Sequence, residues 1–194
     1  MGDRNRGKSR NNRRRRSNNR SGGAYYCQTV HGTEVDSINC PFYYKMGCCR
    51  HGIKCSRQHN YPVTSSTILF PHLWIDEGVE GLSLNDFYND VYTTCEEECG
   101  KIRSLQILDN NIPYLQGNVF VSFENEQSAI KCQNLMHGRF YNGRIIVAEF
   151  STVCDIDSLN CDGRCHQYDR NSCKRGDSCN YLHVKNLIQY GIEN

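Results

Sequence analysis

One pattern of cysteines and histidine occurs twice in this chain, and it restricts the possible folds more than any other feature. The two copies are Cys40-x8-Cys49-x5-Cys55-x3-His59 and Cys165-x7-Cys173-x5-Cys179-x3-His183. Three thiolates and one imidazole within so short a span can close a tetrahedral zinc site, whose metal supplies most of the folding energy of so small a module. We therefore predict two Cys3His zinc fingers, with one Zn2+ each.

Two small metal modules around a longer central segment favour several domains over one in a chain of 194 residues. The predicted boundaries are an Arg-rich arm at 1–24, a first finger at 34–62, a central domain at 65–151, a second finger at 159–186 and a short tail at 187–194. Only the central segment is long enough to bury a sizeable apolar core.

The charge is distributed unevenly along the chain. Residues 1–20 carry nine Lys/Arg and one Asp, which leaves 14 basic and 20 acidic residues in the remainder despite a formal net charge of +2. The arm has no periodic apolar positions, so we expect it to be disordered. Nuclear import or contact with phosphates would use such an arm, whereas a merely solvated charge run is the alternative.

Cysteine usage and hydropathy indicate a soluble intracellular protein. The Arg-rich start lacks the apolar core of a secretory signal, and no apolar run approaches the roughly 20 residues that cross a bilayer. The 13 cysteines are an odd number, which favours metal ligation over a disulfide scaffold. Roles for Cys27 stay open, and Cys48 or Cys161 could exchange with the assigned ligands.

Catalysis has little support in the sequence. Four protein ligands leave a zinc ion no open position for an activated water, and the chain has no Gly-rich phosphate loop and no His-x-Glu deaminase signature. Cys95, Cys99 and Cys132 fit helical core positions or exposed thiols better than a nucleophile. We therefore predict a protein that is not an enzyme.

The central segment alternates strand and helix patterns in the order β-α-β-β-α-β, which predicts an α+β fold. Ser83 can cap a first helix, with Asp86 three residues on, and Leu84, Phe87, Val91 and Cys95 recur at helical spacing. A second helix is predicted at 126–136, with Ala129, Ile130 and Met136 buried, and Asn142-Gly143 signals a tight turn. The predicted strands are 67–73, 101–108, 117–123 and 145–150.

This element order resembles an RNA-recognition motif, but the two signature strands are degenerate. Gln116 and Asn118 occupy positions where the signature has a cation and an aromatic ring, and Leu69 stands where another stacking ring is usual. Phe120 is the lone ring left, so we expect weak base binding by this sheet. We expect the fingers to pack side by side against it, with Leu69 and Phe120 partly covered.

We expect RNA to bind to the loops around the zinc-ligating cysteines and histidines. Aromatic rings interleaved with cations and amides suit unpaired bases, because rings stack on bases and guanidinium groups meet phosphates or base edges. Single-stranded RNA is therefore the predicted ligand, although Tyr44 and Tyr168 could instead only pack over the zinc ligands. The predicted contacts are Phe42, Tyr44, Arg50, Arg57, Gln167, Tyr168, Arg175 and Tyr181.

A second kind of partner is indicated in the central domain. Glu96, Glu97 and Glu98 lie at the predicted C-terminal end of a helix, where the helix dipole disfavours anions. Together with the loop Arg139-Phe140-Tyr141, this acidic end could hold a basic peptide with an aromatic anchor. The alternative is an acidic surface that only keeps the protein soluble.

Six segments of the chain match one known family: His31-Gly32-Thr33-Glu34, Cys40-Pro41-Phe42-Tyr43-Tyr44-Lys45-Met46-Gly47, Arg50-His51-Gly52, Cys55-Ser56-Arg57-Gln58-His59, Gly117-Asn118-Val119 and Cys179-Asn180-Tyr181-Leu182-His183. On these segments the chain, from about Gly32 to Lys185, resembles the family of small subunits of the U2 auxiliary factor of the spliceosome. The resemblance implies a nuclear protein in which both fingers act together on the AG dinucleotide at the 3′ end of introns. It also implies RNA contacts at Phe42, Arg50, Ser56, Arg57, Gln167 and Tyr181.

The resemblance also implies a U2AF-homology-type motif that binds a tryptophan-bearing peptide of a large subunit and so forms a heterodimer. That family uses an Arg-x-Phe loop, and here Arg139 matches, Tyr141 replaces the Phe and Phe140 replaces the family's own Trp. His166 stands where an Arg is common. The predicted function is a pre-mRNA splicing factor; the alternatives are an adaptor of the same zinc class in mRNA decay, polyadenylation or the minor splicing pathway, and a pure protein-interaction module.

Overall fold

The computed structural model describes residues 38–75, 83–154, 156–158 and 161–187. The predictions for the arm at 1–24, for Cys27 and for most of the tail lie outside these residues. Within this described part of the chain, no helix is both long and apolar enough to cross a membrane.

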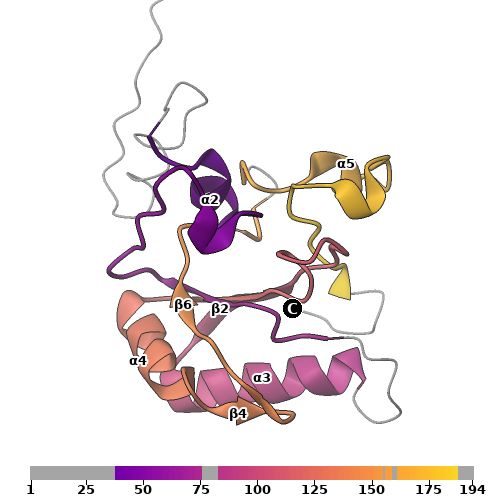
Figure 1. The fold of residues 1–194 in the computed structure, drawn as a ribbon. Coiled ribbons are helices and arrows are strands. Elements are labelled where there is room, and N and C mark those ends of the chain that lie inside the picture. The colour runs from indigo at the N-terminus through magenta and orange to yellow at the C-terminus, as the bar shows by residue number, and fades with distance from the viewer. Residues whose placement is uncertain (1–37, 76–82, 155, 159–160, 188–194) are drawn as a thin grey trace, which may run out of the picture.

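The centre of the molecule is a four-stranded antiparallel sheet in the order β2-β3-β1-β6, with two helices on one face (Figure 1). The predicted order β-α-β-β-α-β is confirmed. Its members are β1 (Thr67–Phe70), α3 (Leu84–Cys99), β2 (Ile102–Ile107), β3 (Val119–Phe123), α4 (Glu126–Met136) and β6 (Glu149–Phe150).

Alternation along β3 divides the sheet into two apolar faces. Val119, Val121 and Phe123 point toward α3 and α4 and belong to the main core, whereas Phe120 belongs to a second core on the opposite face. The helices start as their sequences predict: Asp86 donates its backbone N–H to Oγ of Ser83 at 3.1 Å, and Ser128 donates to Oδ1 of Asn125 at 2.9 Å.

The helices bury nearly the residues that their periodicity predicts. Leu84, Phe87, Val91 and Cys95 of α3 are all in the main core, as are Ala129 and Met136 of α4. Ile130 is only half-buried, and Cys132 is buried in its place. Cys95, Cys99 and Cys132 are therefore core thiols.

The prediction of one continuous last strand at 145–150 is wrong. Its residues are divided between β5 (Arg144–Ile145), which forms a hairpin with β4 (Phe140–Tyr141), and β6. The backbone between them bonds elsewhere, because Ile146 donates its N–H to the carbonyl of Arg139 at 2.7 Å and Ala148 donates to Nδ1 of His137 at 3.2 Å. Asn142 and Gly143 make the predicted tight turn, both with positive φ.

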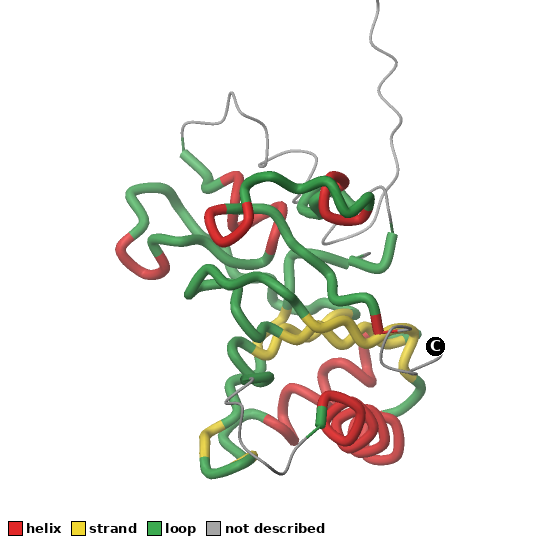
Figure 2. Tube along the Cα trace, turned by 90° about the vertical axis from the view of Figure 1, so that its right-hand side faces the viewer, coloured by secondary structure: helices red, strands yellow, loops and turns green. Residues whose placement is uncertain are grey.

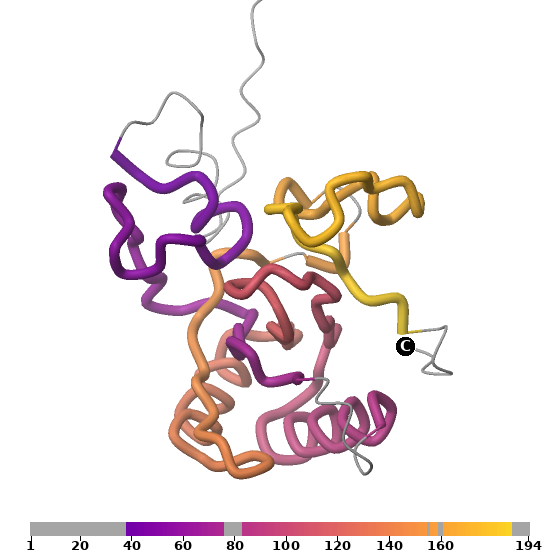
Figure 3. Tube along the Cα trace, turned by 45° about the vertical axis from the view of Figure 1, so that its right-hand side comes forward, coloured from indigo at the N-terminus to yellow at the C-terminus, as the bar shows by residue number. Residues whose placement is uncertain are grey.

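The Cys/His segments lie on the face of the sheet opposite α3 and α4 (Figures 1 and 2). They contain the short helices α2 (Pro41–Met46) and α5 (His166–Asp169) and the 3-10 turns η1 (Gly52–Lys54) and η2 (Gly176–Ser178). Figure 3 shows the two segments side by side above the sheet. Leu69 and Phe120 are 2% and 0% exposed beneath them, so the surface with which an ordinary RNA-recognition motif binds bases is covered.

Candidate nucleic-acid interface and metal centres

Each predicted ligand set comes together at one point of the structure. The candidate ligand atoms of Cys40, Cys49, Cys55 and His59 all lie within 4.8 Å of one another, and the same is true of Cys165, Cys173, Cys179 and His183. The sulfurs of Cys49 and Cys55 are 3.8 Å apart, as are those of Cys165 and Cys179. Tetrahedral zinc with bonds of about 2.3 Å sets its sulfurs about 3.8 Å apart, so both sets fit this ion.

The histidines point to a metal independently of the cysteines. Nε2 of His59 and Nε2 of His183 are buried, and neither has a hydrogen-bond partner among the described residues. A buried imidazole nitrogen without a partner is costly unless it binds a metal. These two atoms therefore complete the donor sets, while Cys48 and Cys161 lie outside both clusters.

Backbone amides point at four of the six cluster sulfurs in the same way. The N–H of the residue two positions on approaches the sulfur in every case: His51 at Cys49, Arg57 at Cys55, Arg175 at Cys173 and Tyr181 at Cys179. Such donors favour the thiolate, and the N–H of Arg175 lowers the pKa of Cys173 to about 7. Burial works in the opposite direction and raises the pKa of Cys179 to about 11.

A tyrosine stacks on the ligand histidine of each finger. Tyr43 lies 4.4 Å from His59 and Tyr168 lies 4.1 Å from His183 between ring centroids, with the rings nearly parallel. Both tyrosines follow the first cysteine of their finger by three residues. Tyr168 also donates its hydroxyl to Asp109 of the central domain, so its ring orients the ligand and anchors the finger.

Most side chains predicted to contact RNA are accessible. Arg50, Ser56, Arg57, Gln167 and Arg175 are exposed, and the rings of Phe42 and Tyr181 are partly exposed beside them. The guanidinium of Arg175 lies over the Tyr181 ring, 5.0 Å from its centroid, and donates to Sγ of Cys165 at 3.6 Å. A cation and a ring held together in this way give a base both a stacking surface and a positive edge.

The prediction of an RNA contact by Tyr44 does not fit the structure. The side chain has no exposed surface, and its hydroxyl donates to Oδ1 of Asn39 at 3.3 Å. Side chains two positions apart on an α-helix point in nearly opposite directions, about 200° apart. When α2 presents Phe42 outward, Tyr44 therefore faces inward. Tyr44 is a core residue of the first finger.

Sequence patterns contain little sign of the residues that join the fingers to the sheet. Asn110 is the clearest example: its side chain is 3% exposed and bonds to backbone groups of the second finger. For the first finger, Oγ1 of Thr152 donates to the carbonyl of Tyr43 at 2.9 Å. The sequence shows an asparagine in a loop between two strands, but only the fold shows that its side chain is buried and which groups it bonds.

The predicted peptide-binding loop lies next to the acidic end of α3. Nη1 of Arg139 is 3.1 Å from Oε2 of Glu98, and Glu97 is exposed nearby while Glu96 accepts a bond from Tyr92. Phe140 projects from the hairpin and is 71% exposed. An ion pair and an exposed ring on one loop are features of a protein-binding surface.

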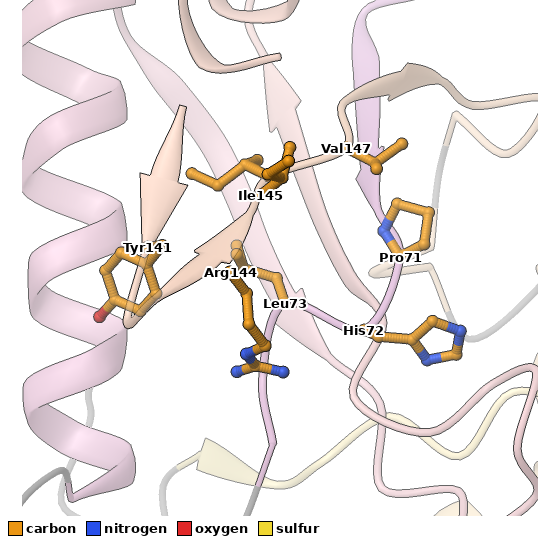
Figure 4. Close-up of a pocket in the computed structure, with 8 residues that line it drawn as sticks. Pro71, His72, Leu73, Tyr141, Arg144, Ile145 and Val147 are labelled. Atoms are coloured by element: carbon orange, nitrogen blue, oxygen red, sulfur yellow. The ribbon is translucent and has the colours of Figure 1, made fainter. Parts of the chain in front are cut away.

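Tyr141 turns the other way, toward α3. Its ring meets Phe87 edge-on with centroids 5.8 Å apart, and burial, together with a hydrogen bond to Asp90, raises the pKa of its hydroxyl. Tyr141 is one of the residues that line a cavity of about 270 Å³ between the end of β1 and the β4–β5 hairpin. Figure 4 shows its ring on the side nearest α3. The hydroxyl that distinguishes Tyr141 from Phe thus has a partner within the domain.

Two family models match the chain. The RNA recognition motif matches residues 79–147, and the zinc finger of the C-x8-C-x5-C-x3-H type and similar matches residues 163–185. The 38 kDa subunit of the splicing factor U2af from Drosophila melanogaster is 35% identical, over 84% of this chain and 67% of its own length. The 26 kDa subunit of U2AF from Homo sapiens is 33% identical, over 86% of this chain and 81% of its own length.

The chain belongs to the U2AF small-subunit family. A small subunit of the splicing factor U2af from Arabidopsis thaliana is 39% identical over 84% of this chain, which spans 62% of the length of that plant protein. In this chain the RNA recognition motif lies between the two Cys3His clusters.

Proposed function

We propose that this protein is a nuclear pre-mRNA splicing factor that binds the AG dinucleotide at the 3′ splice site. Two zinc ions hold the loops of both fingers in shape for one stretch of single-stranded RNA. The central domain forms a heterodimer with a large subunit by binding its tryptophan-bearing peptide. In this proposal the protein binds and positions RNA and catalyses no reaction.

The observation that carries the proposal is the placement of two Cys3His clusters side by side over a covered sheet. With Leu69 and Phe120 buried, the sheet cannot stack bases, so RNA recognition has to come from the fingers. Accessible groups suited to unpaired bases lie in both fingers, with Phe42 and Arg57 in the first and Gln167 and Tyr181 in the second. Two weak contacts on one platform reinforce each other, so neither finger has to bind tightly alone.

The peptide-binding part of the proposal rests on Arg139, Glu98 and Phe140. A basic peptide finds anionic charge at the end of α3, and an aromatic anchor finds the Arg139 guanidinium to stack against. The exposed ring of Phe140 offers apolar area to the same partner. Phe140 and Tyr141, which differ from the residues that the family resemblance predicts in this loop, are both aromatic.

RNA titration tests the proposal. Oligoribonucleotides that end in AG, CG or AC are titrated against the zinc-loaded chain, with a large-subunit peptide present. We expect AG to bind about 5- to 150-fold more tightly than the others, since each lost base contact costs roughly 1–3 kcal/mol. Equal affinity for all three would reject dinucleotide recognition.

Two further experiments separate the alternatives. Capture of a tryptophan-bearing peptide that Arg139→Ala abolishes would favour the splicing role over an adaptor in decay or polyadenylation. RNA affinity that Arg50→Glu leaves unchanged would favour a pure protein-interaction module, because charge reversal at an RNA-facing cation must weaken binding.

A further inference from the structure

The two fingers touch each other directly at a glycine. Gly163, which precedes the first ligand of the second finger by two residues, lies against the end of α2 in the first finger. A β-carbon at Gly163 would overlap the carbonyl oxygen of Lys45 and lie 3.2 Å from Cγ of Met46. Because no unusual φ is needed at Gly163, the close contact between the fingers is what requires glycine here.

The loop between β2 and β3 bonds to the segment of the second finger that carries the exposed Tyr181 ring. Asn110 donates from Nδ2 to the carbonyl of Tyr181 at 2.9 Å, and its Oδ1 accepts the N–H of His183 at 2.8 Å. Asn111 donates to Oδ1 of Asp177 at 2.7 Å. Thus the segment that displays Tyr181 is fixed to the central domain on both sides of the exposed ring.

Tyr114 lies at the meeting point of all three parts. Its hydroxyl donates to Oδ1 of Asn180 in the second finger at 3.0 Å, while its ring packs on the second apolar core beside Cys48 of the first finger. Asn118 supports this arrangement, since its Nδ2 donates to the carbonyl of Tyr114 at 3.2 Å and contacts Sγ of Cys48 at 3.8 Å.

The first finger is fixed to the same platform. Gly47 packs closely on it, because a β-carbon there would lie 3.3 Å from Oγ of Ser151 and 3.4 Å from the ring of Phe120. The bond from Thr152 holds the same C-terminal end of α2, because the Tyr43 carbonyl that accepts it also accepts the N–H of Gly47. Each finger is therefore tied to the sheet as well as to its neighbour.

We propose that Tyr114 and Gly163 are positioning residues that set the spacing of the two fingers before RNA binds. This inference rests on the proposed RNA-binding function and states how it becomes selective. A site that is already assembled loses less conformational entropy on binding, and an RNA of the right sequence engages both fingers at once. Tyr114 acts through Asn180 on the neighbouring Tyr181, and Gly163 acts through the distance to α2.

The first experiment removes one hydroxyl. We expect Tyr114→Phe to weaken binding of the AG-ending RNA about 3- to 10-fold and to leave the CG-ending RNA unchanged, so that the AG-to-CG affinity ratio falls by the same factor. Asn180→Ala should give a similar loss, and the double variant should be no weaker than either single variant. Zinc content and thermal unfolding are measured in parallel, and a fall in ratio at unchanged zinc content identifies a positioning role. An unchanged ratio in Tyr114→Phe would overturn the proposal.

The second experiment reads the finger spacing without RNA. Spin labels attached through non-canonical amino acids at Ile53 and Lys174, both exposed, report the distance between the fingers in the full zinc-loaded chain. We expect a narrow distance distribution that RNA leaves unchanged and that Gly163→Ala shifts or broadens. Gly143→Asn is the control, because Gly143 has open space around it and its φ of +74° suits asparagine.

The two proposals fail in different ways. A broad distance distribution in the free protein that narrows only with RNA would overturn the positioning role even if AG selectivity is present. A narrow distribution in a protein that binds AG, CG and AC equally would show that the spacing of the fingers is fixed before RNA binds. It would refute AG recognition instead.

Discussion

The two fingers have the same internal construction but are attached to the molecule differently. Each has a Cys3His cluster, a tyrosine stacked on the ligand histidine and N–H groups directed at its second and third sulfurs. The first finger docks through Gly47, through apolar contacts, and through bonds from Thr152 to the Tyr43 carbonyl and from Asn118 to Sγ of Cys48. The second is held by a row of polar side chains from the β2–β3 loop, with Asn110 at its centre.

The difference shows which properties are local to a module and which belong to the whole chain. Metal ligation and ring stacking depend on ligand spacing within one finger, so they repeat. Attachment depends on what the sheet offers at each position, so it does not repeat. A substitution that destabilises one finger should therefore leave the other finger folded.

The largest expected effect comes from removing a ligand. Cys173→Ser should reduce bound zinc from two ions per chain to one, because a structural site contributes on the order of 10 kcal/mol or more. Native mass spectrometry counts the ions, and Cys49→Ser is the matched variant in the first finger. Loss of both ions from either variant would show that the fingers cannot fold separately.

Removing the side-chain amide of Asn110 should destabilise the second finger only. Asn110→Ala leaves buried backbone groups of the second finger without partners, at a cost of about 1–3 kcal/mol. Hydrogen exchange should rise across residues 165–183 and stay constant across 40–59. Asn111→Ala is the control, because Asn111 is exposed and its loss should cost much less. Equal exchange changes in both fingers would refute separate attachment.

A smaller effect is expected at the first finger. Thr152→Val keeps the shape of the side chain and removes the bond to the carbonyl of Tyr43, at a cost of about 0.5–1.5 kcal/mol. Here hydrogen exchange should rise in residues 40–59 alone. The proposed docking of α2 would be contradicted if exchange in the second finger rose as much.

The smallest effect concerns Glu149, a half-buried carboxylate on β6. Burial raises its pKa above the ordinary value, so the folded state favours the protonated form and ionisation destabilises it at neutral pH. This destabilisation disappears as pH falls through the raised pKa of the folded state. Glu149→Gln should therefore raise stability at pH 7 by less than about 1 kcal/mol, measured by thermal unfolding. A lower melting temperature in this variant would mean that the ionised carboxylate stabilises the fold instead.

Local features of this protein follow from its sequence, whereas long-range contacts do not. The ligand sets, the Ser83 cap and the two faces of β3 depend on spacing within a few residues, and the structure has all of them. Burial of Tyr44 escapes such reasoning because three aromatic residues in a row in α2 do not say that Tyr43 and Tyr44 face inward while Phe42 faces outward. The break in the last strand escapes it because the break depends on His137, which bonds to Ala148 from another element.

Residues that join distant parts of the chain lie beyond such patterns. Gly163 is one glycine among 16 until the fold sets it against Lys45. Asn110 resembles any loop asparagine until the second finger closes over it. Both are therefore properties of the assembled molecule rather than of a motif.

Joint binding of one RNA by the two fingers underlies the whole proposal, and the RNA affinities of single-finger variants decide whether it occurs. AG-ending RNA is titrated against the wild-type chain, Cys49→Ser, Cys173→Ser and the double variant, with zinc content measured for each. We expect either single variant to lose nearly all the affinity that the double variant loses. Independent, additive losses, or a finger whose removal leaves affinity unchanged, would refute joint binding.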